Sequence, residues 1–154
     1  HAATPSKLLM VGDGPERPIA EELARQYGIE SDVRFLGKQE QMEDILAVSD
    51  LFLLPSEYES FGLVALEAMA SSVAVISSNA GGLAEINIDG KTGYTANVGD
   101  VATMSARAIE LLTDDSKLKA FKHNALEQAK LFDIHHIIPM YENLYRRFCR
   151  TGDC

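Results

Sequence analysis

The chain has 154 residues, 46% of them hydrophobic and 24% charged, which predicts one globular domain that needs neither disulfides nor a metal. Fourteen Lys and Arg against 23 Asp and Glu give a formal net charge of −9, which argues against nucleic acid and anionic membrane surfaces as partners. No apolar run comes near the ~20 residues of a transmembrane helix, and both cysteines lie in the last six residues, which favours a reducing cytoplasm.

Short apolar runs alternate with stretches of helical spacing along the first part of the chain. The predicted strands are 7–12, 33–36, 51–54, 73–76 and 93–96, and the predicted helical segments between them are 19–27, 42–48, 63–70 and 83–88. The run 51–54 (LFLL) is apolar on both faces, which is typical of a buried parallel strand.

From residue 101 onward the spacing is helical, over 101–112, 116–131 and 137–147, with Asp114 or Asp115 as an N-cap. Strands that alternate with helices predict an α/β fold in which a parallel sheet is covered on both faces. In such sheets ligands bind beyond the carboxyl ends of the strands. The loops that follow strands, 12–15, 37–40, 55–61 and 77–82, are therefore the places to look for a site.

The first of these loops is Gly12-Asp13-Gly14-Pro15. It begins like a dinucleotide-binding fingerprint, but Arg17 stands where the third glycine belongs, so the motif fails. A tight strand-to-helix turn explains the two glycines as well as a close approach of backbone to a ligand does.

The third loop leads into a helix and reads PSEYESFGLVALEAMA over 55–70. Gly62 at the junction leaves bare amides, and the helix N-terminus adds about half a positive charge, so a phosphate can bind here without Lys or Arg. Glu59 precedes the helix and Glu67 lies inside it, and carboxylates beside an anion site suit the vicinal hydroxyls of a ribose or hexose. Spacing alone also fits a first-turn acid at 59 and a solvated helix residue at 67.

The block ESFGLVALE (59–67), followed by AMA, resembles the E-x7-E signature of family 4 retaining glycosyltransferases, whose GT-B fold has two Rossmann-like halves. Further segments in that family's order are LLMVGDGPE (8–16), VRFLGKQ (33–39), SDLFLLPS (49–56), GGLAE (81–85) and DGKTGY (89–94). The resemblance implies that residues 1–154 form a single Rossmann-like nucleotide-sugar-binding domain. This domain would be the C-terminal half of a GT-B fold and a fragment of a longer two-domain enzyme.

The resemblance also implies residue roles. Glu67 would hold the ribose hydroxyls of UDP, and Glu59 would hold hydroxyls of the transferred sugar as the catalytic carboxylate. The residues that would surround the sugar and the distal phosphate, largely through backbone amides, are Ser60, Phe61, Gly62, Leu63 and Val64. Those that would line the uracil pocket are Phe35, Leu36, Gly37 and Lys38, while Gly14 would flank the nucleotide.

Within the family, FLGKQ and ESFGLV are most similar to members that transfer N-acetylglucosamine from a UDP-sugar to L-malate in bacillithiol biosynthesis. The implied reaction retains the anomeric configuration and uses no cofactor, since the UDP-sugar is a substrate. The Arg and Lys that grip the diphosphate in this family, and its acceptor-binding N-terminal half, match no segment here. The chain is therefore expected to be inactive alone, with that half as its partner.

Several alternatives stay open at this stage. The chain also fits a non-catalytic nucleotide-sugar-binding or interaction module, or a family member with another donor and acceptor, and a homo-oligomer is compatible with it. Ser72 stands where the family has Gly after the helix, at a cost of up to ~1 kcal/mol if φ is positive. His123, His135 and His136 lack a cluster at metal-ligand spacing, so no metal site is predicted. Glu85 fits a ligand contact and a first-turn acid equally.

Overall fold

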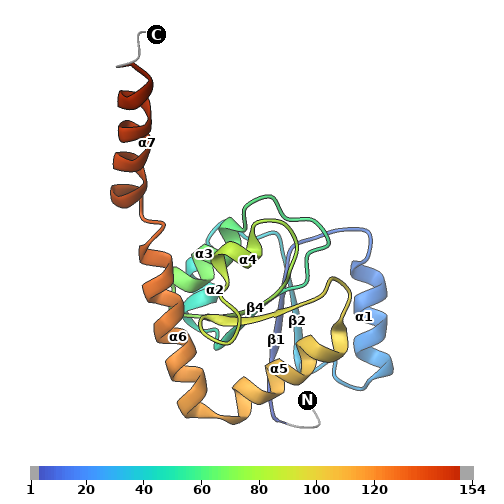
Figure 1. The fold of residues 1–154 in the computed structure, drawn as a ribbon. Helices are drawn as coiled ribbons and strands as arrows, with labels where there is room; N and C mark the ends of the chain where they lie inside the picture. The colour runs from blue at the N-terminus through green and yellow to red at the C-terminus, as the bar shows by residue number, and fades with distance from the viewer. Residues whose placement is uncertain (1–3, 150–154) are drawn as a thin grey trace. The chain divides into compact units, whose positions relative to one another are not determined.

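The computed structural model describes residues 4–149 and divides into two compact units, the first ending at Ile45 and the second beginning at Leu46 (Figure 1). The first unit holds β1 (Leu8–Val11), α1 (Arg17–Gln26) and β2 (Val33–Gly37), and α2 (Met42–Ala47) crosses the boundary. The elements of the second unit are β3 (Leu51–Leu54), α3 (Leu63–Ala70), β4 (Ala74–Ser78), α4 (Leu83–Ile86), β5 (Gly93–Ala96), α5 (Val101–Thr113), α6 (Asp115–Lys130) and α7 (Ile134–Cys149).

Every predicted element is present, and the differences lie at element ends. Asp114 caps α6 by accepting from the Lys117 amide at 3.0 Å, which confirms the predicted N-cap region. The last helix begins at Ile134, three residues before the predicted start at 137, because Asp133 accepts from the His135 amide at 2.8 Å. No helix within residues 4–149 is long and apolar enough to cross a membrane.

The first unit is built on a parallel pair of strands. β1 pairs with β2 from Leu8 opposite Val33 to Val11 opposite Gly37, with an irregular step before Val11. Beyond the strands, the Gly12 amide donates to the Gly37 carbonyl at 2.8 Å. This bond brings the loop after β1 beside the end of β2.

The second unit is built on a parallel sheet in the order β3-β4-β5. The central strand β4 is buried along its whole length, and its Ala74 and Ile76 pack with residues of β5, α5 and α6 in the core. β3 is instead the edge of this sheet, and its Leu53 is 42% exposed. The expectation that LFLL is buried on both faces is therefore wrong for Leu53, because a side chain is buried only where another element covers the face of the sheet to which it points.

A buried polar network joins α4 to the sheet. The Asn87 side chain, just after α4, lies within donor range of the Val75 carbonyl at 3.2 Å, the Ser77 hydroxyl at 3.0 Å and the Tyr94 carbonyl at 3.0 Å. The Thr92 hydroxyl donates to Asn87 Oδ1 at 3.0 Å. Because buried polar atoms are costly when unpaired, this network fixes where the chain leaves α4.

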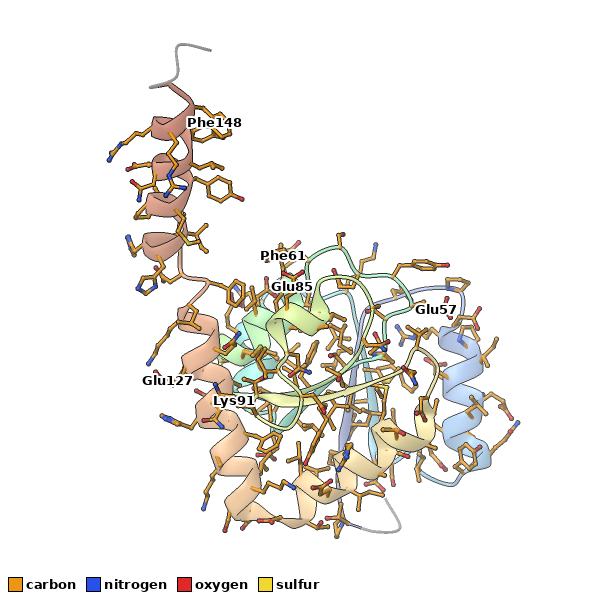
Figure 2. All side chains as sticks on the ribbon, viewed as in Figure 1. Glu57, Phe61, Glu85, Lys91, Glu127 and Phe148 are labelled. Atoms are coloured by element: carbon orange, nitrogen blue, oxygen red, sulfur yellow. The ribbon has the colours of Figure 1, made fainter. Side chains whose placement is uncertain are left out.

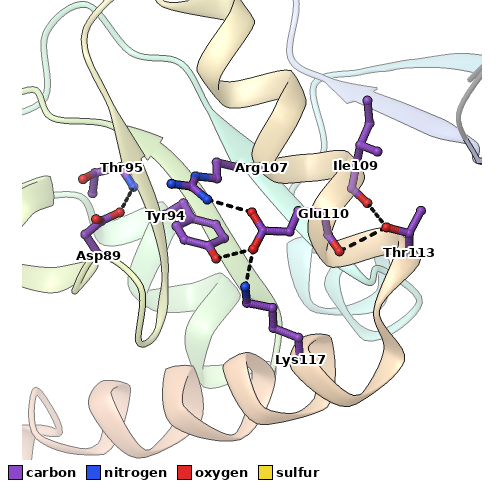
Figure 3. Close-up of polar contacts among 8 residues, drawn as sticks. All are labelled: Asp89, Tyr94, Thr95, Arg107, Ile109, Glu110, Thr113 and Lys117. Atoms are coloured by element: carbon purple, nitrogen blue, oxygen red, sulfur yellow. Dashed lines mark hydrogen bonds and ion pairs between the residues drawn. The ribbon is translucent and has the colours of Figure 1, made fainter.

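A charged cluster ties β5, α5 and α6 together (Figure 3). The Tyr94 hydroxyl donates to Glu110 at 2.9 Å, Arg107 Nη1 donates to it at 2.7 Å, and the Lys117 ammonium pairs with the same carboxylate. These donors, Lys117 foremost, lower the pKa of Glu110 from 4.5 to about 2. The cluster uses both oxygens of its carboxylate for structure.

The helix end at Ser72 confirms the strain expected from the sequence. Ser72 has φ +58°, the one positive value at a non-glycine residue among those described. Its amide donates to the Met69 carbonyl at 3.0 Å, and the next amide, of Val73, donates to the Ala68 carbonyl at 3.0 Å. This pair of hydrogen bonds is the pattern with which many helices end on a residue in the left-handed conformation. Glycine adopts that conformation without the steric penalty that a Cβ atom causes.

Parallel strands with flanking helices confirm the predicted α/β class. That residues 1–154 act as a single domain stays a prediction.

Candidate functional site

The loop between β3 and α3 ends on a glycine with an unusual backbone. Gly62 is the N-cap of α3, has φ +92°, and makes no side-chain cap because it has no side chain. The first amides of a helix have no partner within the helix, so those of Leu63 and Val64 face outward as donors. The junction therefore has a left-handed residue that favours glycine, followed by the helix amides on which the predicted anion site depends. That an anion binds there stays a prediction.

Glu59 reaches the same junction from the loop. One of its carboxylate oxygens, Oε1, accepts from the Gly62 amide at 3.1 Å, and the residue is half-buried. Together with Ser60 it lines a hollow of about 420 Å³, whose other walls are Glu57, Tyr58 and Gly81. A carboxylate held by one backbone amide beside an open hollow is suited to accept hydrogen bonds from a polyhydroxyl ligand.

Glu67 lies one turn further along α3 and is exposed. It lines a second hollow, of about 330 Å³, together with Leu63 and Leu66 of α3 and with residues of α6 and the segment after it, among them Lys130 and Asp133. Glu59 and Glu67 therefore border different hollows in this structure. Both residues lie on α3 or next to it, but the two hollows have no lining residue in common.

Phe61 links the loop to the segment after α6. Its ring stands at 81° to the Phe132 ring, with centroids 6.4 Å apart, and half of the residue is exposed. Figure 2 shows Phe61 and Glu85 at the same end of the second unit. Glu85 is exposed in the first turn of α4, where a first-turn acid and a ligand contact both remain predictions.

The remaining predicted residues lie in the first unit, at the carboxyl ends of β1 and β2. Gly14 is exposed, and its amide donates to Asp13 Oδ1 at 3.0 Å. The residues predicted to line the uracil pocket lie at the end of β2. Phe35, Leu36 and Gly37 are half-buried, and Lys38 is exposed. The bond from Gly12 to Gly37 brings these two predicted loops together.

In the sequence, Arg17 stands out only as the residue that breaks the glycine motif. In the structure its guanidinium lies 5.8 Å from the centre of the Phe35 ring, and a Cβ on Gly37 would lie 3.8 Å from its Nη1. Its pKa is raised, mainly by the hydrogen bond that it donates to Glu21 at 2.8 Å. The charged guanidinium of Arg17 therefore lies beside residues that are predicted to line the base pocket. Only the tertiary structure shows this proximity.

Metal binding finds no support in the described part of the chain, where no group of three or more His, Cys, Asp or Glu side chains is placed to hold an ion. His123, His135 and His136 are exposed, and His136 Nδ1 lies 2.9 Å from the Lys130 carbonyl oxygen. Function without a metal or cofactor stays a prediction.

Comparison with known proteins identifies the family. The model described as "Glycosyl transferases group 1" matches residues 3–128. N-acetyl-alpha-D-glucosaminyl L-malate synthase of Bacillus anthracis is 44% identical over 141 residues, which are 91% of this chain and 37% of that protein. This likeness agrees with the one indicated by FLGKQ and ESFGLV. The chain spans 37% of the length of this relative, and 36% and 32% of the lengths of two further curated relatives.

Solved structures show the same fold. Sucrose-phosphate synthase from Thermosynechococcus elongatus superposes with a TM-score of 0.81 at 30% identity, over 94% of this chain and 39% of that one. Anabaena HepE, solved in complex with UDP, gives a TM-score of 0.79 at 28% identity, over 92% of this chain and 41% of that one. These neighbours are GT-B glycosyltransferases, which confirms the predicted fold. The chain belongs to the glycosyl transferases group 1 family.

Proposed function

We propose that this chain is the donor-binding part of a retaining glycosyltransferase that transfers N-acetylglucosamine from UDP-N-acetylglucosamine to a small acceptor such as L-malate. The observation that carries the proposal is the junction before α3, where the Glu59 carboxylate and the Gly62 amide meet at 3.1 Å beside an open hollow. The donor and acceptor are suggested by the name of the relative that is 44% identical, and UDP by the ligand in the HepE structure.

The chemistry assigned to this junction is electrostatic. The distal phosphate of UDP binds the amides of Leu63 and Val64, where the α3 dipole stabilises the negative charge that grows as the diphosphate departs. The bond between the sugar C1 and the phosphate oxygen breaks, the acceptor hydroxyl adds to C1 on the same face, and its proton leaves with UDP. Glu59 orients the sugar through its hydroxyls, and Glu67 holds the ribose.

The first unit supplies the base pocket in this proposal. Gly14 flanks the nucleotide, and the uracil lies against the end of β2, where Arg17 lies near Phe35. The guanidinium is a donor for a carbonyl oxygen of the base or for a phosphate.

The acceptor is bound by the N-terminal half of the longer enzyme, which becomes the partner of this chain. Exposed apolar residues recur every three or four positions along α7, which supports such a partner. They are Ile134, Ile138, Tyr141 and Tyr145. An apolar stripe of this kind is normally covered by another protein surface.

The cytoplasm stays the expected location.

The direct test is a titration of this chain with UDP and, separately, with UMP, ADP and NAD, followed by amide chemical shifts. We expect selective binding of UDP, with the largest shifts at Gly62, Leu63 and Val64. Equal responses to all four nucleotides, or shifts confined to other regions, would contradict the donor site.

A second test separates an enzyme fragment from a binding module. Adding the acceptor-binding half of a relative in trans should restore sugar transfer or donor hydrolysis if the proposal is right. Binding of UDP without any turnover in that mixture would favour a non-catalytic nucleotide-sugar-binding module.

A further inference from the structure

The loop between β4 and α4 packs directly on the Glu59 loop. The Ser78 hydroxyl at the end of β4 donates to the Ser56 carbonyl at 2.5 Å, which ties the start of the one loop to the end of the strand. Five residues later, Leu83 of α4 packs against Gly62, where a Cβ would lie 2.8 Å from the Leu83 Cδ2 atom. The two segments are therefore in contact at both ends.

Between these ends, Gly81 makes the tightest approach. A Cβ built on Gly81 would lie 1.6 Å from the Glu59 carbonyl oxygen and 2.9 Å from the carbonyl carbon. Both atoms are backbone, so no side-chain rotation relieves the clash. Gly81 also has φ +52°, in the left-handed region. Only glycine fits between the two loops as they stand.

Glu59 is thus held at two points. Gly81 packs against its carbonyl group, and the Gly62 amide donates to Oε1 of its side chain at 3.1 Å. If the Glu59 carbonyl group is pushed aside, the Cα atom moves with it, and the side chain that carries the carboxylate then starts from a position that no longer suits the bond to the Gly62 amide. The position of the carboxylate then depends on a residue that need not touch any ligand.

We infer that Gly81 is a positioning residue for Glu59: by letting the β4–α4 loop lie on the Glu59 carbonyl, it keeps the carboxylate on the Gly62 amide and poised for the sugar. The part that concerns the sugar rests on the proposed function. The β4–α4 loop thereby acts on recognition of the transferred sugar, whereas the contacts to UDP come from other residues.

The test compares Gly81→Ala with Gly90→Ala in this chain. Gly90 has φ +69°, and a Cβ there meets nothing within 4 Å, so both variants carry the left-handed strain and only the first adds a clash. Glu59→Ala serves as the reference for a lost carboxylate. Gly82→Ala adds a milder contact, 3.0 Å from the Ser60 carbonyl oxygen, and is the second variant should Gly81→Ala fail to fold.

The first readout needs no ligand: it is hydrogen exchange of the Gly62 amide, followed by NMR. We expect exchange about tenfold faster in Gly81→Ala and in Glu59→Ala than in the parent chain, as for the loss of one hydrogen bond. Gly90→Ala should match the parent. Gly82→Ala should change exchange in the same direction as Gly81→Ala, by less. Parent-like exchange in folded Gly81→Ala, or in Gly82→Ala where Gly81→Ala does not fold, would overturn the inference.

The second readout is the ratio of dissociation constants for UDP-N-acetylglucosamine and UDP. We expect Gly81→Ala to lose about tenfold in affinity for the sugar nucleotide, while its affinity for UDP changes little. UDP is the control, because general damage to the fold would weaken the binding of both compounds. Equal losses would contradict a positioning role. If the parent chain binds neither compound, the proposed function fails, whereas the exchange measurement still decides whether Gly81 holds Glu59.

Discussion

Two carboxylates of the second unit are held in contrasting ways. Glu110 has three donors from side chains, two of them cations, and both of its oxygens are engaged. Glu59 is held by one backbone amide and borders a hollow. Both residues are half-buried, so the number of donors, and not the exposure, distinguishes the two carboxylates.

The largest expected effect concerns the buried polar network that joins Asn87 to the sheet. Asn87→Ala should lower the free energy of unfolding by roughly 3 kcal/mol, because the partners of its buried amide lose their hydrogen bonds. Asn79→Ala is the control, since the exposed side-chain amide of Asn79 donates to Asn97 at 3.0 Å, and a loss of about 0.5 kcal/mol or less is expected. Urea unfolding measures both, and equal losses would contradict the role of the network.

The next effect concerns the ligand. Glu67→Ala should weaken UDP binding by ~1 to 3 kcal/mol, the range for a lost charge-assisted hydrogen bond, as measured by calorimetry. Glu110→Gln, which removes a charge from the structural cluster, should leave that affinity unchanged. Undiminished UDP affinity in folded Glu67→Ala would refute the ribose assignment.

A smaller effect should follow pH at the structural carboxylate. The pKa of Glu110 is lowered from 4.5 to about 2, so its contribution to stability is complete above pH 4.5 and is lost as the pH falls towards 2. Glu110→Gln should therefore be less stable than the parent near neutral pH, and this difference should shrink between pH 4.5 and about 2. A difference that stays constant over this range, measured by denaturant unfolding, would show that the ionised cluster is not responsible.

The smallest expected effect is a gain. Ser72→Gly should raise the free energy of unfolding by up to ~1 kcal/mol, because it removes the Cβ from a left-handed residue. Ser71→Gly is the matched control: with φ −83° it relieves no strain and should not stabilise. Since Ser72 lies at the far end of α3 from Gly62, UDP affinity should stay the same in both variants. A stability loss in Ser72→Gly would contradict the strain.

Much of the fold follows from local pattern. Glycine and proline mark the loops, and the alternation of apolar runs with helical spacing predicts each strand and helix to within a few residues, as at β5 (Gly93–Ala96) and α3 (Leu63–Ala70). The exposure of Leu53 did not follow, because the run LFLL does not say whether both faces of its strand are covered. Which elements cover a face of the sheet is decided by the tertiary structure.

The candidate site divides in the same way. The amides before α3 were predictable, since Gly62 precedes a helix and the dipole is a property of any helix. The contact of Gly81 with the Glu59 carbonyl was not, because it joins residues 22 positions apart. The double glycine at 81 and 82 was the only available signal.

By itself the sequence determined the order of elements, the strained end of α3 and the loop that carries Glu59 and Gly62. These depend on residue type and on neighbours along the chain. Only the tertiary structure decided that Tyr94 of β5 and Lys117 of α6 join Arg107 at Glu110, that β4 is the buried strand, and that Arg17 stands by Phe35. Such contacts arise from packing between distant segments, which no local pattern encodes.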